Sequence, residues 1–241
     1  AGIDADTQID LMVAAVAGAS RCDATELANQ ISSVVNAGRT SVVADVSVLF
    51  AAAKITGPAV ATIVGTGSIA WFRRADGSVR RAGGLGPFAG DAGSGYWIGR
   101  QAIAGNVLPD LSDQLQHEKL SAAAGGADSF DSAHVTRIAS HAARVFELAD
   151  RDPQAKQIVE QAADEITKLL IDAVSESPHV TTSTDSQPLA RVYGGGMAVN
   201  QVAWLAEIRS RCAERGLLLA NPVLIVEPVD GALQIAIDDI R

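Results

Sequence analysis

The sequence predicts an α/β fold, because short apolar segments of strand length alternate with longer segments whose apolar residues recur at helical spacing. The chain has 241 residues, of which 48% are hydrophobic and only 4% aromatic. We therefore expect a core built mainly of Ala, Val, Ile and Leu. The length suits one large α/β domain or about one and a half lobes of a two-lobe fold.

The first part of the chain is expected to alternate between strands and helices. The apolar run at 11–17 predicts a strand, and the β-branched run at 40–43 predicts another. Between them, 25–35 has the spacing of an amphipathic helix, with Asp23 as its N-cap. A second helix is expected at 47–54.

Gly57 and Pro58 form a break at which we place a domain boundary, so that the two predicted parts are residues 1–57 and 58–241. The second part opens with a strand at 60–64. The elements expected after it are strands at 69–74 and 79–81 around an Asp76-Gly77 turn, helices at 96–104, 132–149, 153–174 and 199–215, strands at 191–193 and 223–226, and a polar loop at 175–188.

A block of closely spaced glycines between residues 63 and 99 carries the strongest functional signal. It reads I-V-G-T-G-S-I-A-W-F-R-R-A-D-G-S-V-R-R-A-G-G-L-G-P-F-A-G-D-A-G-S-G-Y-W-I-G. Glycine lets backbone N–H groups approach an anion without a Cβ in the way. The turn Gly65-Thr66-Gly67-Ser68 is therefore a candidate phosphate site, in which Thr66, Ser68 and backbone amides face the anion.

Three common motifs do not explain this block. Residues 65–70 fit the dinucleotide pattern G-x-G-x-x-G/A, but that pattern requires a helix to follow, and here a hairpin is expected. The sequence contains no P-loop of the form G-x-x-x-x-G-K-[ST]. It also contains no G-x-S-x-G elbow, which argues against a serine hydrolase.

Several stretches resemble one known family. The hairpin, the G-G-L-G at 83–86 and the G-D-A-G-S-G-Y-W-I-G run at 90–99 resemble the ATP-binding lobe of the N-acetylglucosamine kinase and BadF/BadG/BcrA/BcrD group. That group belongs to the superfamily of actin, hexokinase and the Hsp70 chaperones. Residues 42–45 are similar to the family's strand that ends in a catalytic Asp, 192–198 to its adenosine motif, and 228–232 to its closing P-x-x-G-A. Their order and rough spacing match along nearly the whole chain.

The resemblance implies an actin/hexokinase-like (ribonuclease H-like) two-lobe α/β fold with an incomplete N-terminal lobe. The family opens with a D-x-G-G-T hairpin that binds phosphates and orients Mg²⁺, whereas residues 2–7 here are only a faint echo of it. We expect residues 1–9 to be a helix end and linker. Residues 1–57 would then be the remainder of the N-terminal lobe, and 58–241 the C-terminal, ATP-binding lobe.

The implied activity is phosphoryl transfer from ATP, with Mg²⁺, to a hydroxyl of an amino sugar such as N-acetylglucosamine or glucosamine. Carried over by position, Asp45 would be the general base. The remaining assignments are Gly65, Thr66, Gly67 and Ser68 for the phosphates, Gly194, Gly195 and Gly196 for adenosine, Gly86 and Asp91 for the sugar, and no metal ligand. Because relatives commonly dimerise, a homodimer is possible.

Two departures from the family pattern bear on the sugar. The family's G-G-W-G has become Gly84-Leu85-Gly86, which removes an aromatic platform, and its G-D-E-G-S has become G-D-A-G-S. Altered sugar recognition is therefore expected.

Each candidate also has a structural alternative. Asp45 could be the N-cap of the helix at 47–54, and Asp91 a cap of the next helix. Thr66 and Ser68 could satisfy their own turn, and the glycines at 194–196 could serve tight packing. These alternatives stay open at the level of sequence.

Two other functions remain. The chain could be a BadF-type activator ATPase, but that role uses a cysteine-ligated iron–sulfur cluster between subunits, and Cys22 and Cys212 are not placed like such ligands. Alternatively, it could be a non-catalytic nucleotide- or sugar-binding homologue.

Charge and composition argue against other classes of function. A net charge of −9 disfavours a broad surface for nucleic acid or anionic membrane. The four histidines show no metal-ligand spacing, and the two cysteines suggest no disulfide framework. With no signal peptide or membrane span in the sequence, we expect a cytoplasmic protein. The pairs Arg73-Arg74 and Arg80-Arg81 are expected on a solvated face.

Overall fold

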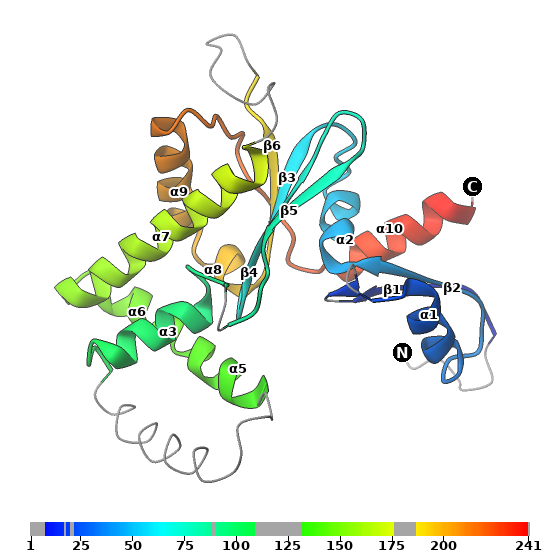
Figure 1. Ribbon diagram of the computed structural model, residues 1–241, viewed down its shortest axis with the longest axis horizontal. Helices are drawn as coiled ribbons and strands as arrows, with labels where there is room; N and C mark the ends of the chain where they lie inside the picture. Colours follow the sequence, from blue (N-terminus) through cyan, green and yellow to red (C-terminus); the bar gives the residue numbers. More distant parts are fainter. Residues whose placement is uncertain are drawn as a thin grey trace.

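The computed structural model describes residues 8–16, 18–19, 22–87, 90–108, 132–175 and 187–240. The expectations for residues 2–7, for His117 and His179, and for most of the polar loop at 175–188 lie outside these residues. Figure 1 shows the arrangement of the described elements along the chain.

A five-stranded sheet with the order β5-β4-β3-β6-β7 forms the centre of the molecule. Its strands are β3 (Ala59–Val64), β4 (Ser68–Arg73), β5 (Val79–Gly83), β6 (Ala190–Gly194) and β7 (Val223–Leu224). β3 pairs antiparallel with β4 and parallel with β6. The carboxyl ends of β3 and β6 therefore meet at the same edge of the sheet.

The predicted hairpin of β4 and β5 is confirmed. Gly77 takes a φ of +81° in the turn, and Ser78 N donates to Asp76 Oδ1 over 2.9 Å. The expected solvated arginine face is wrong, because Arg73, Arg74, Arg80 and Arg81 are all half-buried.

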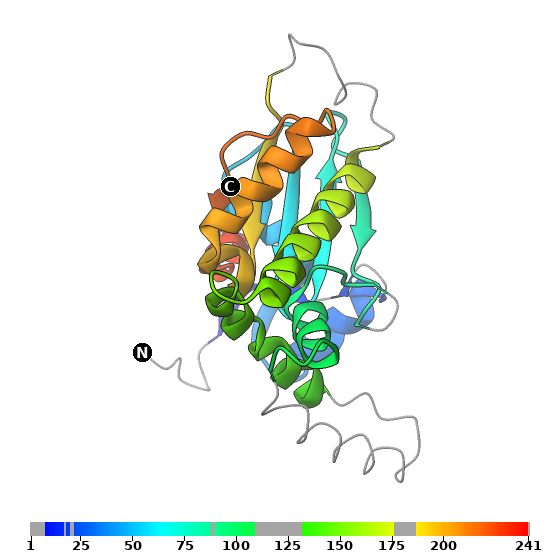
Figure 2. The ribbon, with the colours of Figure 1, turned by 90° about the vertical axis from the view of Figure 1, so that its left-hand side faces the viewer.

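Helices cover one face of this sheet. They are α3 (Gly95–Ala104), α5 (Ser132–Ser140), α6 (Ala142–Leu148), α7 (Pro153–Val174), α8 (Gly196–Asn200) and α9 (Val202–Glu214). Figure 2 shows α7 and α9 side by side in front of the strands. The main core lies between them and includes Val60, Phe72, Ile166 and Leu205.

The prediction of α7 at 153–174 is confirmed. Asp152 is its N-cap and accepts hydrogen bonds from Gln154 N (2.7 Å) and Ala155 N (3.1 Å), and Pro153 occupies the first turn. Two other long helices are broken. The segment at 132–149 divides at His141, whose amide bonds to the Ile138 carbonyl, and the segment at 199–215 is two helices separated at Gln201.

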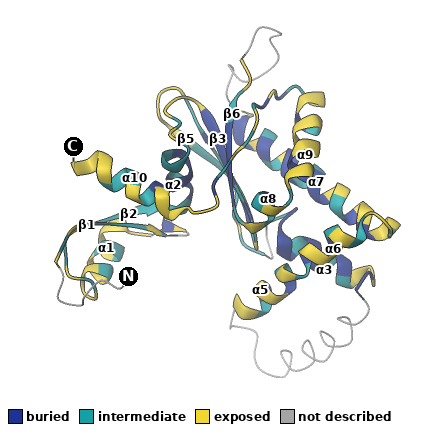
Figure 3. Cartoon of the chain, turned by 180° about the vertical axis from the view of Figure 1, so that it is seen from behind, coloured by how far each residue is buried: buried dark blue, intermediate teal, exposed yellow. Residues whose placement is uncertain are grey.

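On the opposite face, α2 (Asp45–Ala52) packs against β3 and β6 through Val46, Leu49 and Phe50. Both faces of β3 are therefore covered, and five of its six residues are buried, as Figure 3 shows in dark blue. This burial explains its predominantly apolar sequence, in which Thr62 is the one polar residue.

The N-terminal elements form a smaller, parallel two-stranded sheet of β1 (Ile9–Val16) and β2 (Ala37–Ala44). No residue of either strand is buried. The helix between them, α1 (Ala24–Ser32), has the predicted N-cap, since Asp23 accepts from Thr25 N over 2.8 Å.

The final helix, α10 (Val229–Ile240), was not predicted. It returns to the N-terminal part and packs against α2 and β1 (Figure 1). Arg39 of β2 also forms an ion pair with Asp239. The division into 1–57 and 58–241 stays a prediction, and α10 links the two parts. Among the described helices, none combines the length and apolarity that a membrane span needs.

Candidate functional site

The glycine turn 65–68 joins β3 to β4 and is fastened to the start of α3. Gly65 N donates to Gly67 O over 3.0 Å, which closes the turn. The carbonyls of Gly65 and Thr66 accept from Gly95 N (2.8 Å) and Tyr96 N (3.1 Å). The first amides of α3 are thus used to hold the turn, which fixes its position relative to that helix.

The second glycine cluster, 194–196, lies directly against this turn. A Cβ on Gly65 would be 3.7 Å from Gly196 N and 3.8 Å from the Cα of Gly195. Gly195 has a φ of +92°, and a Cβ there would lie 2.5 Å from the carbonyl oxygen of Val64. Two segments about 130 residues apart therefore meet with no side chain between them, as the parallel pairing of β3 and β6 dictates.

The two glycine segments open into a pocket of about 350 Å³. Its floor is Gly65, Thr66 and Gly196, and its walls come from α5, α6 and α8. The wall residues are Thr136, Ala139, Ser140, Ala142, Ala143, Phe146, Met197, Asn200 and Gln201. The volume and the mixture of apolar surface with a few hydroxyl and amide groups are those of a small-molecule site.

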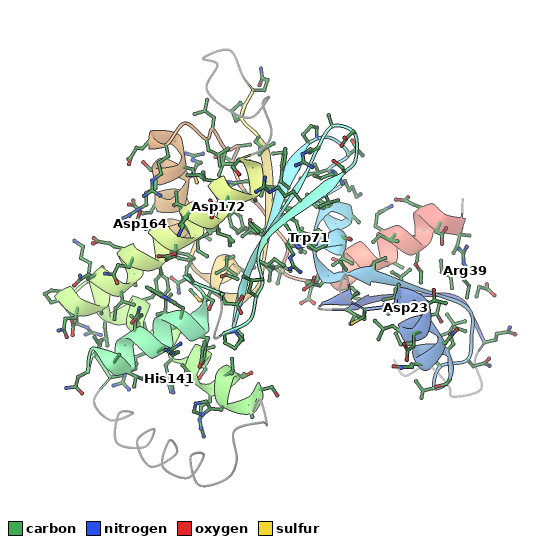
Figure 4. All side chains as sticks on the ribbon, in the orientation of Figure 1. Asp23, Arg39, Trp71, His141, Asp164 and Asp172 are labelled. Atoms are coloured by element: carbon green, nitrogen blue, oxygen red, sulfur yellow. The ribbon has the colours of Figure 1, made fainter. Side chains whose placement is uncertain are left out.

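Sequence reasoning missed the walls of this pocket. Thr136, Ser140 and Phe146 belong to a segment that shows only helical periodicity. His141, at the break between α5 and α6 (Figure 4), separates two wall residues, Ser140 and Ala142. No local motif marks these residues, because they reach the pocket only through the packing of α5 and α6 on α3.

Asp91 is brought to the glycine turn. A Cβ on Gly67 would be 2.7 Å from Asp91 Oδ2, and Ser68 Oγ donates to the Ala92 carbonyl over 3.0 Å. Asp91 has a positive φ of 56°. The alternative that it caps the next helix is wrong, because Ser94 is the N-cap of α3 and its hydroxyl accepts from Trp97 N.

Gly86 lies in the loop that runs from β5 toward Asp91. Its φ is +91°, and its carbonyl accepts from Gly90 N over 2.9 Å. The neighbouring Leu85 is 56% exposed, so its side chain does not cover the site. Gly86 does not line the pocket at the glycine turns.

Asp45 begins α2 at the carboxyl end of β2. Its Oδ1 accepts from Val46 N over 2.9 Å, and burial of the carboxyl raises its pKa while that hydrogen bond lowers it. It is not the N-cap, a position that Ala44 occupies. Asp45 does not line the pocket, but Leu49, one turn further along α2, packs where a Cβ on Gly194 would be 2.8 Å away.

ATP and Mg²⁺ can be tested against these residues. The glycine segments bring two stretches of backbone together beside a pocket of suitable volume, and the Cβ position of Gly196 has no atom within 4 Å. This open backbone surface fits a phosphate-bearing nucleotide. Within the described ranges, no three His, Cys, Asp or Glu side chains are placed to hold a metal ion.

Solved structures show which fold this is. A candidate N-acetylglucosamine kinase from Porphyromonas gingivalis is 20% identical, with a TM-score of 0.69 over 97% of this chain and 79% of that protein. A candidate N-acetylglucosamine kinase from Chromobacterium violaceum is also 20% identical, with a TM-score of 0.63 over 98% and 78%. A ROK family glucokinase from Streptomyces griseus, solved with glucose and AMPPNP, is 16% identical, with a TM-score of 0.51 over 87% and 70%. The predicted actin/hexokinase-like α/β fold is confirmed.

A search of curated proteins finds no significant match. The sequence profile of the BadF/BadG/BcrA/BcrD ATPase family, by contrast, matches residues 1–236. This match agrees with the motifs at both glycine segments and covers almost the whole chain. The chain belongs to the BadF/BadG/BcrA/BcrD ATPase family.

Proposed function

We propose that this protein transfers the γ-phosphoryl group of ATP to a hydroxyl of an amino sugar, such as N-acetylglucosamine or glucosamine. The observation that carries the proposal is the junction of Gly65–Ser68 with Gly194–Gly196 beside a 350 Å³ pocket. The family assignment and the fold shared with sugar kinases support it.

The glycine turn would bind the phosphates through its backbone amides and the Thr66 hydroxyl, while the pocket walls would hold the nucleoside. Phosphoryl transfer depends mainly on positioning and on stabilisation of charge. The hydrogen bonds from the α3 amides hold the turn in one conformation before substrate arrives. A bound Mg²⁺ would supply positive charge at the phosphates.

Asp45 would accept the proton of the attacking sugar hydroxyl as that oxygen bonds to phosphorus and ADP leaves. Partial burial strengthens this carboxylate as a base, because it raises the pKa. Asp91 would accept a hydrogen bond from another sugar hydroxyl. The exposed Leu85 offers no aromatic face to the sugar.

Transfer is conditional on a D-x-G-G-T type of hairpin, for which residues 2–7 are only a faint counterpart. The test therefore begins with the encoded start of the natural protein. Coupled ADP release is then measured with and without N-acetylglucosamine and glucosamine. ADP that forms only with an amino sugar supports the proposal, and sugar-independent or absent ADP release contradicts it.

The second candidate is a nucleotide-binding homologue without turnover, which tight AMPPNP binding without ADP release would favour. The role of a BadF-type activator is disfavoured, because that role requires a cysteine-ligated iron–sulfur cluster between subunits. Cys22 is exposed near α1, whereas Cys212 is buried in the main core, where burial raises the pKa of its thiol to about 11. A cluster shared between subunits needs thiols at the surface, and Cys212 does not meet this requirement.

A further inference from the structure

A second cavity, of about 700 Å³, lies on the α2 side of the five-stranded sheet. It is bordered by α2, by the strands β4 and β5, and by α10. The lining residues are Ser47, Phe50, Ala51, Lys54, Ile55, Thr56, Trp71, Arg73, Val79, Gln234, Ile235, Ile237 and Asp238. It shares no residue with the pocket at the glycine turns, and its volume is that of a small-molecule site.

Arg73 places a positive charge in this cavity. Its guanidinium lies 4.4 Å from the centre of the Phe50 ring. Nε and Nη2 donate to the Gly57 carbonyl over 3.2 and 2.9 Å, and Nη2 also donates to the Ile55 carbonyl, whereas Nη1 makes no hydrogen bond within the described residues. Burial lowers the pKa of Arg73, and no carboxylate within the described residues forms an ion pair with it. A half-buried guanidinium without a counter-ion favours an incoming anion.

Lys54 adds a second positive charge at the rim. It is exposed, has a φ of +53°, and forms no ion pair within the part of the chain that the structure describes. The one acid on the lining is Asp238, which is exposed and accepts from Gln234 Nε2 over 2.9 Å. The cavity is thus net positive in a protein whose net charge is −9.

The remaining walls combine a large apolar surface with the polar side chains of Ser47, Thr56 and Gln234. Phe50, Ile55 and Ile237 form much of the lining, and Trp71 lies on the same side of the hairpin as α2 (Figure 4). An ion with a full hydration shell would leave this surface in contact with water. A ligand that carries both a charge and an apolar body would cover it.

We propose that this cavity binds a small organic anion with an apolar or aromatic body, as an effector site separate from the nucleotide pocket. Two elements connect this cavity to the proposed catalytic and phosphate-binding residues. α2 begins at Asp45 and reaches the cavity at Phe50 and Ala51, and β4 begins at Ser68 and reaches it at Trp71 and Arg73. The effector role rests on the proposed function, whereas binding of the anion does not.

The binding test uses 1-anilinonaphthalene-8-sulfonate as the probe and its neutral analogue 1-anilinonaphthalene as the comparison. The sulfonate should bind at one dominant site with energy transfer from Trp71, which Trp71→Phe should reduce to the weaker transfer from Trp97 and Trp204. Lys54→Asn should weaken sulfonate binding about tenfold, as loss of one charged contact does, and leave the neutral analogue unchanged. Asn tolerates the left-handed backbone at this position, so the variant should fold.

Arg73→Met should weaken sulfonate binding at least as much, and Arg100→Met is its matched control. Arg100 also stacks on an aromatic ring, that of Tyr96, at 5.7 Å, but lines a different cavity. Unchanged binding in both Lys54→Asn and Arg73→Met, or an equal loss in Arg100→Met, would overturn the proposal. If circular dichroism shows that Arg73→Met does not fold, sulfonate binding by Lys54→Asn alone tests the proposal.

Separation and coupling are tested with AMPPNP. Saturating AMPPNP should leave the bound sulfonate in place, and stoichiometric displacement would put the probe in the nucleotide pocket and overturn the proposal. The sulfonate should shift the Kd of AMPPNP about fivefold or more, and an unchanged Kd would overturn the effector role. If AMPPNP does not bind at all, the proposed function fails, while the sulfonate titration still tests the cavity.

Discussion

Gly195 shows why a single backbone position controls the candidate site. Gly195→Ala would combine a positive φ of 92° with a Cβ only 2.5 Å from the Val64 carbonyl oxygen. We expect a loss of about 1–3 kcal/mol in the free energy of unfolding and at least a tenfold loss in AMPPNP affinity. Urea unfolding and calorimetric titration measure the two effects.

The matched control is Gly77→Ala. Gly77 has a φ of +81° but no atom within 4 Å of its Cβ position. This variant should lose about 1 kcal/mol from backbone strain and keep the AMPPNP affinity. If both variants bind AMPPNP as the wild type does, the glycine junction is not the nucleotide site.

Asp45 is the residue whose role the geometry leaves to experiment. Asp45→Asn keeps the size of the side chain and removes the base, so sugar-dependent ADP release should fall by at least about a hundredfold. AMPPNP affinity should not change, because Asp45 does not line the pocket. Coupled ADP release and calorimetry provide the two readouts.

Asp23→Asn is the control for that experiment. Asp23 is also a carboxylate at the start of a helix, but its helix is α1, which packs on the small N-terminal sheet. Asn is as good an N-cap as Asp. Its activity should equal that of the wild type. An Asp45→Asn enzyme with normal turnover would exclude Asp45 as the base.

At the scale of an element, the break between α5 and α6 makes the stability of the protein depend on pH through His141. Burial lowers the pKa of His141, and the nearby Arg144 and Arg137 act in the same direction. The unfolded chain therefore binds this proton more readily than the folded protein. Stability from His141 is complete above the unfolded pKa of about 6.5 and is lost as the pH falls through the lower folded pKa.

Thermal melts from pH 7.5 to 4.5 should show this loss, and His141→Gln should make the melting temperature less dependent on pH. His134→Gln is the comparison, since His134 is also half-buried and lies on α5 of the same pair of helices. An identical pH slope for wild type and His141→Gln would show that the break does not disfavour the charged imidazole.

The elements also show how far sequence reasoning reaches. The hairpin and α7 were predictable, because Asp76-Gly77 and Asp152-Pro153 determine local backbone geometry. The breaks at His141 and Gln201 were not, because neither site carries Gly or Pro and tertiary packing sets them. α10 was missed because its short apolar run follows a motif that was interpreted only as a family signature.

The same distinction applies to the candidate site. The glycines at 65–68 and 194–196 are recognisable as motifs, and Asp91 reaches the first of them as part of the same block. The pocket walls on α5 and α6 depend on contacts with α3 that no local pattern encodes. The proximity of Lys54, Arg73 and Ile237 likewise depends on where α10 docks.

At the scale of the whole molecule, α10 holds the two sheets together. A Cβ on Gly231 would lie 1.9 Å from the Val48 carbonyl oxygen, so α10 and α2 are in backbone contact there. Gly231→Ala should separate them, destabilise the protein by about 2 kcal/mol or more, and raise amide exchange in β1 and β2 above that in β3.

Leu233→Ala is the control on the same helix, since Leu233 is 60% exposed. It should change stability by less than about 0.5 kcal/mol. Hydrogen exchange with mass spectrometry resolves the segments. If amide exchange in Gly231→Ala rises equally in both sheets, α10 does not specifically stabilise the N-terminal sheet.

The docking of α10 on β1 and α2 also orders events on the ribosome. β1 emerges early, yet it has no buried residue, and α10, which packs on it, is made only after the whole five-stranded sheet. Until then β1 has its contacts with β2 and α2 but lacks those with α10. The N-terminal strands are therefore where trigger-factor-like chaperones would bind longest, and where a translational pause before residue 229 would be most harmful.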